Sequence, residues 1–368
     1  MKQIKRIDKS LFVILIMFII FGIVMVYSAS FPYAYIRFEN PEHYFYRQLF
    51  WGVMSLVFLY VIIHIPYRIY GRLTPILLLI TFVLLILVLV PQIGIERNFS
   101  RRWLGFGSLQ FQPVEIAKMT LLLYFAYFYS KKQDLVHHFG KGVMPPLIVL
   151  VIVFGLILMQ PDLGSATLLL FSCGLLLFFT RIPYRYLLSL LLLAVAAFVF
   201  FAIRSPYRLE RITSFLDPFA DAEGTGYQLI NSYISIHTGG VFGLGLGQSV
   251  QKLGYLPEAH TDFIMSIIAE ELGLFGVLIV LSFYAFLLIK GLQIGKNAPD
   301  LFGRLLAVGI IFQITMQACI NLSAMLGLLP ITGITLPFVS YGGSSLLITM
   351  TAMGILLNIS VYAKKENS

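Results

Sequence analysis

The chain has 368 residues, of which 59% are hydrophobic and only 12% are charged, and its formal net charge is +9. A soluble protein carries about 25% charged residues and a disordered one carries few apolar residues, so the composition excludes both classes. The unbroken apolar runs also exclude a large membrane β-barrel, whose strands alternate apolar and polar residues. In a membrane protein the positive charge indicates basic loops that face anionic lipid, and no nucleic-acid partner is expected.

Ten apolar runs predict one all-α domain over residues 1–368, a polytopic membrane protein with about ten transmembrane helices of about 20 residues each. The expected spans are 11–30, 49–65, 73–90, 113–130, 144–160, 164–180, 185–203, 263–289, 305–328 and 345–362. The first run resembles a signal peptide, but its length and the nine later spans favour an uncleaved span.

The charges of the loops predict the orientation of the spans, because cytoplasmic loops carry an excess of Lys and Arg. With the N-terminus inside, the inner segments hold sixteen basic and four acidic residues. We therefore expect both termini to be cytoplasmic.

The segment 204–262, between spans seven and eight, is expected to be a long extracellular loop. Its glycines between Gly239 and Gly247 alternate with apolar residues. We expect such a stretch either to lie at the membrane–water interface or to re-enter the protein. Irregular backbone at membrane depth must be buried in protein or line a cavity. A phosphate-binding loop is the alternative, although no strand precedes the glycines and no Gly-Lys-Ser/Thr follows them.

Two spans carry polar residues that are costly in a membrane unless they are paired or hydrated. Glu115 and Lys118 lie on one face of span four, which indicates either a neutral ion pair or a lysine that helps to hold an anionic ligand. Span nine carries Gln313, Gln317 and Asn321 four residues apart. This polar stripe is expected either to hydrogen-bond a neighbouring helix or to line a cavity.

Asp262 stands at the start of span eight and shares a helix face with Ser266 and Glu270. In a straight helix Glu270 would lie about 12 Å deeper, at 1.5 Å per residue. Thr261 or Asp262 is expected to cap the helix, or Asp262 is expected to act as a general base at the outer mouth of the bundle.

Several arginines are expected on the outer side, where short loops rarely carry basic residues. They are Arg47, Arg97, Arg101, Arg102, Arg204, Arg208 and Arg211. Outer acids such as Glu96 explain some of them, and a guanidinium fork that binds phosphate in bidentate fashion explains the rest. A basic rim above one carboxylate predicts a lipid diphosphate or a similar anion as the ligand.

Five motifs, in order along nearly the whole chain, resemble the SEDS family (shape, elongation, division and sporulation). They are RNFSRRW at 97–103, QPVE at 112–115, QPDLG at 160–164, YLPEAHTDF at 255–263 and PFVSYGGSS at 337–345. The stretch 332–337 is most similar to the FtsW and SpoVE branch, whereas RodA members more often carry a proline where Thr335 stands.

The resemblance implies a peptidoglycan glycosyltransferase that polymerises lipid II into glycan strands on the outer face of the bacterial cytoplasmic membrane, for cell division or sporulation. Undecaprenyl diphosphate would be the leaving group and Asp262 the catalytic residue. The implied partners are a class B penicillin-binding protein, which is a transpeptidase, and other divisome or elongation proteins. A lipid II flippase is the main alternative, and a non-catalytic scaffold is another.

The residues expected to bind the diphosphate or lipid II are basic: Arg47, Arg101, Arg102, Lys118, Arg208 and Arg211. The residues expected to support the site are Glu115, Glu258, His260, Glu270, Ser340, Gly342 and Gly343. A divalent cation, Mg²⁺ or Mn²⁺, that bridges the diphosphate is compatible with this chemistry. No cluster of ligands in the sequence demands one, so the metal ligands stay open.

Overall fold

The computed structural model describes residues 7–97, 100–107, 109–203 and 213–366. Helices occupy all ten predicted spans in this part of the chain. They are α1 (Lys9–Phe38), α2 (His43–His64), α3 (Arg68–Leu87), α4 (Pro113–Lys131), α5 (Met144–Leu158), α6 (Leu163–Leu177), α7 (Tyr184–Ile203), α10 (Ile264–Lys296), α11 (Leu301–Met325) and α12 (Gly343–Glu366). The prediction of an all-α polytopic protein is confirmed.

Seven of the described helices are long and apolar enough to cross a membrane. These are α1, α2, α3, α5 with the turn before it, α10, α11 and α12. Two of the others differ from these seven: α4 carries Glu115 and Lys118, and α6 has 15 residues. At 1.5 Å per residue, α6 extends about 22 Å, less than the ~30 Å of a hydrocarbon core.

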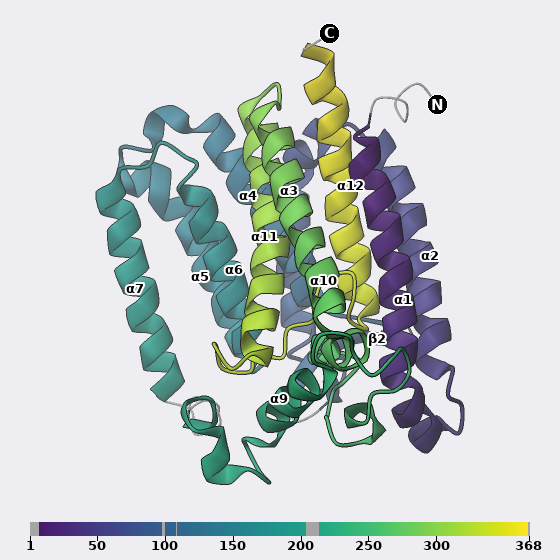
Figure 1. The fold of residues 1–368 in the computed structure, drawn as a ribbon. Coiled ribbons are helices and arrows are strands. Elements are labelled where there is room, and N and C mark those ends of the chain that lie inside the picture. Colours follow the sequence, from purple (N-terminus) through teal and green to yellow (C-terminus); the bar gives the residue numbers. More distant parts are fainter. Residues whose placement is uncertain (1–6, 98–99, 108, 204–212, 367–368) are drawn as a thin grey trace.

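Both termini lie at the same end of the bundle, as an even number of crossings requires (Figure 1). The amide of Asp8 donates to the Ser360 hydroxyl over 3.2 Å, and the Asp8 carboxylate lies 3.3 Å from the Lys290 ammonium. These contacts tie the start of α1 to α12 and α10.

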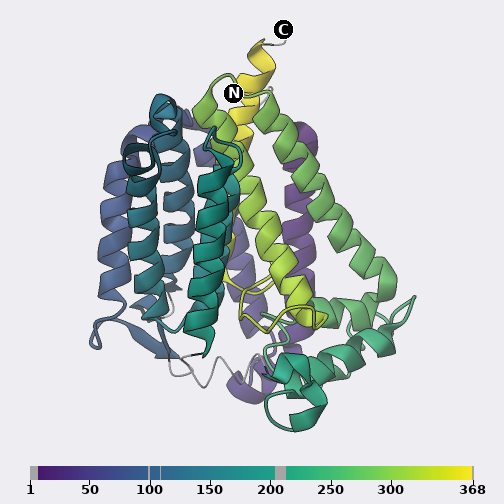
Figure 2. The same cartoon turned by 90° about the vertical axis from the view of Figure 1, so that its left-hand side faces the viewer.

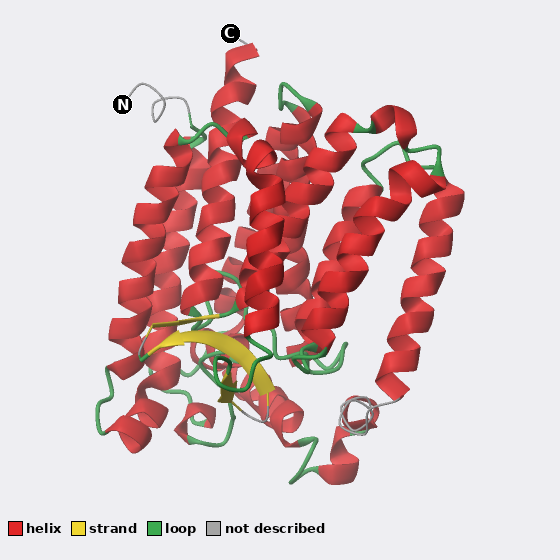
Figure 3. Ribbon diagram, turned by 180° about the vertical axis from the view of Figure 1, so that it is seen from behind, coloured by secondary structure: helices red, strands yellow, loops and turns green. Residues whose placement is uncertain are grey.

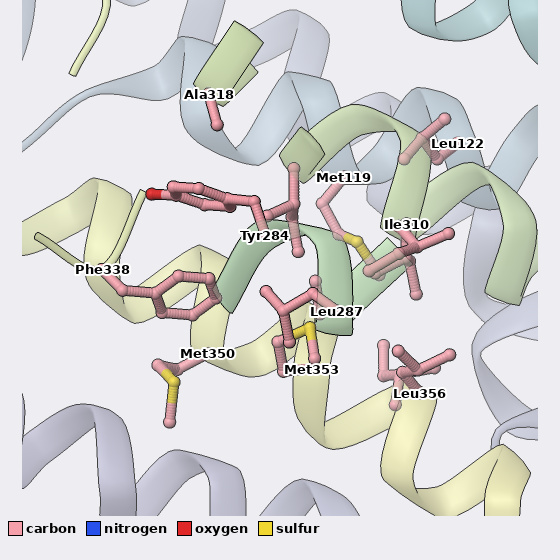
Figure 4. Close-up of a cluster of buried hydrophobic side chains, with 14 of the residues drawn as sticks. Met119, Leu122, Tyr284, Leu287, Ile310, Ala318, Phe338, Met350, Met353 and Leu356 are labelled. Carbon is pink, nitrogen blue, oxygen red and sulfur yellow. The ribbon is translucent and has the colours of Figure 1, made fainter. Parts of the chain in front are cut away.

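The core lies around α11 and α12, whose apolar segments are 72% and 78% buried, against 28% for α2 and 22% for α3. Figure 4 shows Leu122 of α4, Leu287 of α10, Ile310 of α11 and Met353 of α12 in one apolar cluster. Helices α11 and α12 are therefore the centre of the bundle. The peripheral helices direct apolar side chains, such as Leu79 of α3, toward lipid.

Two elements at the end of the bundle opposite the termini were not predicted. A three-stranded antiparallel sheet, β1 (Ile95–Arg97), β2 (Ser100–Phe106) and β3 (Leu109–Phe111), connects α3 to α4. It lies at the end of the bundle opposite the termini (Figure 3). The described part of the long loop contains α9 (Tyr227–Gly239), which lies across the same end (Figure 2).

Helix α10 is not straight, because its backbone is broken at Gly273, where φ is 62° and ψ is −155°. The glycine-rich loop closes on this break: the amides of Leu244 and Gly245 donate to the carbonyls of Glu270 and Glu271, both over 2.9 Å. A Cβ atom on Gly243 would lie 2.2 Å from the Glu271 carbonyl oxygen, so only glycine permits this approach. The loop amides thus satisfy the carbonyls that the break leaves without helical partners. Because the amides of Leu244 and Gly245 bind these carbonyls, they are not directed at a phosphate, as a phosphate-binding loop would require.

Candidate active site

Asp262 lies in the turn that leads into α10, and its side chain is partly exposed. The turn closes with the amides of Thr261 and Phe263, which donate to the Glu258 carbonyl over 3.1 and 3.3 Å. Phe263 occupies the N-cap position of α10 and makes no side-chain capping bond, so the expectation that Thr261 or Asp262 is the N-cap residue is wrong. The Thr261 hydroxyl instead donates to the exposed Glu258 carboxylate over 2.7 Å.

The backbone of Asp262 is held from two sides. The Asn321 side chain of α11 donates to the carbonyl of Asp262 over 2.8 Å and to that of Ile334 over 2.7 Å. The Ser340 hydroxyl donates to the Thr261 carbonyl over 2.5 Å. These bonds fix the direction from which the carboxylate leaves the chain, without using the carboxylate oxygens themselves.

Gly333 leaves space beside the Asp262 carboxylate. A Cβ atom at this position would lie 3.6 Å from Asp262 Oδ2, and the φ of Gly333 is +71°, a conformation that favours glycine. Gly164 of the QPDLG motif lies on the other side of the same loop, where a Cβ atom would lie 2.4 Å from the Thr332 carbonyl oxygen. The loop at 332–334 is therefore pressed between α6 and Asp262.

The PFVSYGGSS motif closes the site from the α12 side. Ser340 accepts a bond from the Leu336 amide over 2.8 Å, and the Tyr341 amide donates to the His260 carbonyl over 2.9 Å. A Cβ atom on Gly343 would lie 2.3 Å from the indole nitrogen of Trp51, so this glycine lets α2 pack against the start of α12. At Gly342 a Cβ atom would meet only ordinary contacts.

The predicted ion pair in span four is present. Lys118 Nζ lies 2.9 Å from Glu115 Oε1, and both side chains are buried. Lys118 also donates to Gln317 Oε1 over 3.0 Å, and the Gln317 amide nitrogen donates to the Thr335 carbonyl over 2.9 Å. The pair is thus joined to the loop that touches Asp262, through a residue of the polar stripe.

The polar stripe on α11 serves both of the roles considered for it. Gln317 and Asn321 hydrogen-bond the 334–335 backbone, and Gln317 also bonds Lys118 of the neighbouring helix. Gln313 lines a cavity of about 10 Å³ together with Glu115. That volume corresponds to about one water molecule.

The arginines that were expected on the outer side are not equivalent. The Arg101 guanidinium lies 3.0 Å from Glu96, its cross-strand partner, and both are exposed. Arg102 donates to the carbonyls of Gln160 and Pro161, and so fixes the QPDLG turn. Arg47 makes no ion pair with any residue that the structure describes. Arg208 and Arg211, together with Arg204, lie outside the described residues.

His260 is buried among aromatic rings rather than exposed to an anion. Its ring centroid lies 5.4 Å from that of Tyr33, 4.5 Å from Tyr44 and 5.8 Å from Tyr341. Burial lowers the pKa of His260 from its ordinary 6.5 to about 4, although the nearby Glu258 charge acts in the opposite direction. The imidazole is therefore neutral at pH 7 and supports the turn before Asp262 by packing.

A second buried network, around Lys252, was missed. Lys252 Nζ lies 2.6 Å from Glu271 Oε1, and the Ser28 hydroxyl donates to Glu271 as well. Glu270 beside it accepts the Val250 amide over 2.9 Å and the Ser249 hydroxyl over 2.5 Å. A lone lysine in an apolar, glycine-rich loop and two adjacent acids in a span were the available signals. The Glu270 carboxylate therefore binds the loop at Ser249 and Val250 and so holds the loop against α10.

No group of three or more His, Cys, Asp and Glu side chains that could hold a metal ion occurs among the described residues. A cage built from protein side chains alone is thus absent from that part of the chain. Mg²⁺ is commonly held by one or two carboxylates together with substrate phosphates, and Asp262 is compatible with that mode.

Together these features define a polytopic helical membrane protein in which Asp262, a partly exposed aspartate, is positioned by backbone hydrogen bonds at the end of the bundle opposite the termini. The FtsW/RodA/SpoVE family, described as "Cell cycle protein", has a model that matches residues 8–365. The chain belongs to this family, and the resemblance carried by the five motifs is confirmed.

Relatives match over almost the full length. The chain is 40% identical over 357 residues to stage V sporulation protein E of Bacillus subtilis (strain 168), covering 97% of this chain and 98% of that protein. It is 39% identical over 364 residues to the probable peptidoglycan glycosyltransferase FtsW of Geobacter metallireducens (strain ATCC 53774 / DSM 7210 / GS-15), covering 99% and 97%. A chain in a solved structure described as "Structural coordination of polymerization and crosslinking by a peptidoglycan synthase complex" is similar with a TM-score of 0.79 and 31% identity, covering 96% and 97%.

Proposed function

We propose that the protein polymerises lipid II into glycan strands at the outer face of the bacterial cytoplasmic membrane, with both termini in the cytoplasm. The family and its relatives support the broader activity, that of a peptidoglycan glycosyltransferase in cell wall synthesis. The observation that carries the finer proposal is Asp262. It carries a partly exposed carboxylate at the end of the bundle away from the termini; Asn321 holds its backbone carbonyl, and Ser340 holds the carbonyl of the preceding Thr261.

In the proposed reaction, Asp262 takes the proton from the 4-hydroxyl of the acceptor sugar as that oxygen attacks the anomeric carbon of the donor. The bond from the anomeric carbon to undecaprenyl diphosphate breaks, and the electron pair leaves with the diphosphate. General-base catalysis of this kind contributes about 10²–10⁴ in rate. A second carboxylate is not required, because a diphosphate leaves well without protonation.

Cations near the diphosphate would stabilise the negative charge that develops on it. We assign this role first to Arg47, which has no carboxylate partner among the described residues, and then to Arg101, whose partner Glu96 is exposed. Arg208 and Arg211 stay in the proposal on sequence grounds alone. A Mg²⁺ or Mn²⁺ ion bound with the substrate would add charge at the same place.

We further propose that the protein works with a class B penicillin-binding protein, a transpeptidase that crosslinks the product, and with other divisome or elongation proteins. The support is the similarity to a chain of a peptidoglycan synthase complex. The process it serves would be division or sporulation.

Labelled lipid II, incubated with the purified protein with and without its transpeptidase partner, tests the proposal. The expected product is a ladder of glycan strands. A protein that moves labelled lipid II between the leaflets of a vesicle and forms no polymer under either condition would be a flippase, and the proposal would fail.

A further inference from the structure

A cavity of about 290 Å³ lies at the end of the bundle that carries both termini. The starts of α3 and α11 and the end of α4, three helices that pack against one another, form it. Its volume lies at the lower end of the range for ligand sites, roughly 300–1,000 Å³, which suits a small head group. Nothing in the proposed reaction at Asp262 uses it.

The lining of this cavity carries three cations, Arg68, Arg72 and Lys131, and one carboxylate, Asp300, which leaves two positive charges in excess. Asp300 is already bound by three donors: the Tyr67 hydroxyl at 2.6 Å, Arg68 Nε at 2.8 Å and the Gly303 amide at 2.7 Å. Arg68 is thereby matched with Asp300.

Arg72 and Lys131 are the other two cations that line the cavity. Neither makes an ion pair with a carboxylate in the described part of the chain, and both side chains are exposed. Two unmatched cations from different helices therefore line one cavity.

The wall behind these cations is packed. A Cβ atom on Gly71 would lie 2.8 Å from Cδ2 of Tyr127 and 3.2 Å from Cζ of Phe302, so the glycine brings α3 close to both rings. The Tyr127 and Phe302 rings meet edge to face at 6.0 Å. The hydroxyl of Ser130 donates to the Tyr127 carbonyl over 2.8 Å. The cavity is thus held open between fixed elements.

The surface beside Arg72 is apolar and faces outward. Ile69, Leu73 and Ile76 on α3 are 39%, 39% and 57% exposed, on a helix whose apolar segment is only 22% buried. Such a surface in a membrane protein contacts acyl chains. The cationic cavity therefore opens next to lipid.

We propose that this cavity binds the phosphate group of an anionic phospholipid, whose acyl chains lie along α3. Arg72 supplies a planar guanidinium that can hold two phosphate oxygens, and Lys131 supplies a point charge from the facing helix. Basic pockets between transmembrane helices on the cytoplasmic side bind acidic head groups in this way. A soluble phosphate shares the same chemistry, but the adjacent apolar face favours the lipid.

The test compares the full-length detergent-purified protein with the double variant Arg72→Gln/Lys131→Gln, which loses both unmatched cations. The control is Lys132→Gln/Lys296→Gln, which changes the net charge equally at exposed lysines that do not line the cavity. The melting temperature is measured while phosphatidylglycerol, phosphatidylcholine or inorganic phosphate is titrated, and bound lipid is counted by native mass spectrometry. Single variants at Arg72 and Lys131 serve if the double variant does not fold.

Phosphatidylglycerol, but not phosphatidylcholine, is expected to stabilise the wild type and the control, and the double variant should bind it at least about tenfold more weakly. Equal binding by the double variant and the control, or equal stabilisation by both lipids, would overturn the proposal. Stabilisation by inorganic phosphate that matches phosphatidylglycerol would overturn the assignment to lipid and identify a soluble phosphate as the occupant.

Discussion

Two acidic regions at the beginning of α10 differ in how their carboxylates are used. At Asp262 the surrounding polar side chains bind the backbone and leave the side chain partly exposed. At Glu270 and Glu271 the carboxylates themselves are bound, by loop amides, hydroxyls and Lys252, and both residues are almost fully buried. The difference separates a partly exposed carboxylate at the end of the bundle from two buried carboxylates that hold the broken helix to its loop.

The largest loss of stability is expected from Glu271→Gln. This change leaves the Lys252 ammonium buried without its counter-charge, which costs about 3–5 kcal/mol. The double variant Lys252→Met/Glu271→Gln removes both charges and should recover more than half of that loss in thermal unfolding. A single variant as stable as the wild type would show that this region is not the anchor we describe.

Lys118→Met tests whether the buried pair in α4 belongs with the anchors or with the substrate site. We expect a loss of about 3 kcal/mol, because Glu115 then lacks its partner. The cavity beside Glu115, which has room for about one water molecule, moderates the loss. If Lys118→Met and Glu115→Gln both keep their melting temperature but abolish polymerisation, the pair serves the substrate.

Because His260 is buried in the turn before Asp262, we expect the free energy of unfolding to depend on pH. Its folded pKa of about 4 lies below the ordinary 6.5, so the unfolded chain binds the extra proton first. The stabilising contribution is complete above pH 6.5 and is lost as pH falls toward 4, by about 2–3 kcal/mol. His260→Gln should flatten this part of the stability profile, whereas a change at the exposed His237 should not. Equal profiles for the two variants would contradict the burial of His260.

The smallest expected effects are those of lysine substitutions at Arg47 and Arg102, which distinguish an arginine that binds substrate from one that stabilises the fold. Arg47→Lys keeps the charge but loses the bidentate fork, so turnover of lipid II should fall about tenfold with no change in melting temperature. Arg102→Lys should instead lower the melting temperature, because Arg102 holds the carbonyls of Gln160 and Pro161. Unchanged turnover in Arg47→Lys would remove Arg47 from the proposed diphosphate site.

Sequence predicted the helices well because each span depends mainly on local hydrophobicity. The pair Glu115–Lys118 was also predictable, since residues three apart in a helix are neighbours. The break at Gly273 was not, because it depends on amides of the loop more than twenty residues earlier that satisfy the freed carbonyls. The contact of Lys252 with Glu271 and Ser28 likewise joins segments that no local pattern relates.

The site itself was predicted in part. Asp262 was identified as a candidate from its place at the mouth of a span and from the resemblance. Its neighbour Gly333 was not singled out, although a glycine with positive φ beside a carboxylate leaves room for a ligand. The sheet was missed because β1 and β3 have only three residues each and β2 carries two adjacent arginines, so that in the sequence all three resemble a loop.

The most direct test of the account is polymerisation of labelled lipid II by Asp262→Asn and Glu270→Gln side by side, with each rate divided by the amount of folded protein. We predict that Asp262→Asn folds like the wild type and loses about 10²–10⁴ in rate. Glu270→Gln should be less stable but should keep a rate per folded molecule within about tenfold of the wild type, since its carboxylate only binds the loop. An Asp262→Asn protein that keeps more than about a tenth of the normal rate, or a Glu270→Gln protein that folds and makes no glycan, would contradict the assignment.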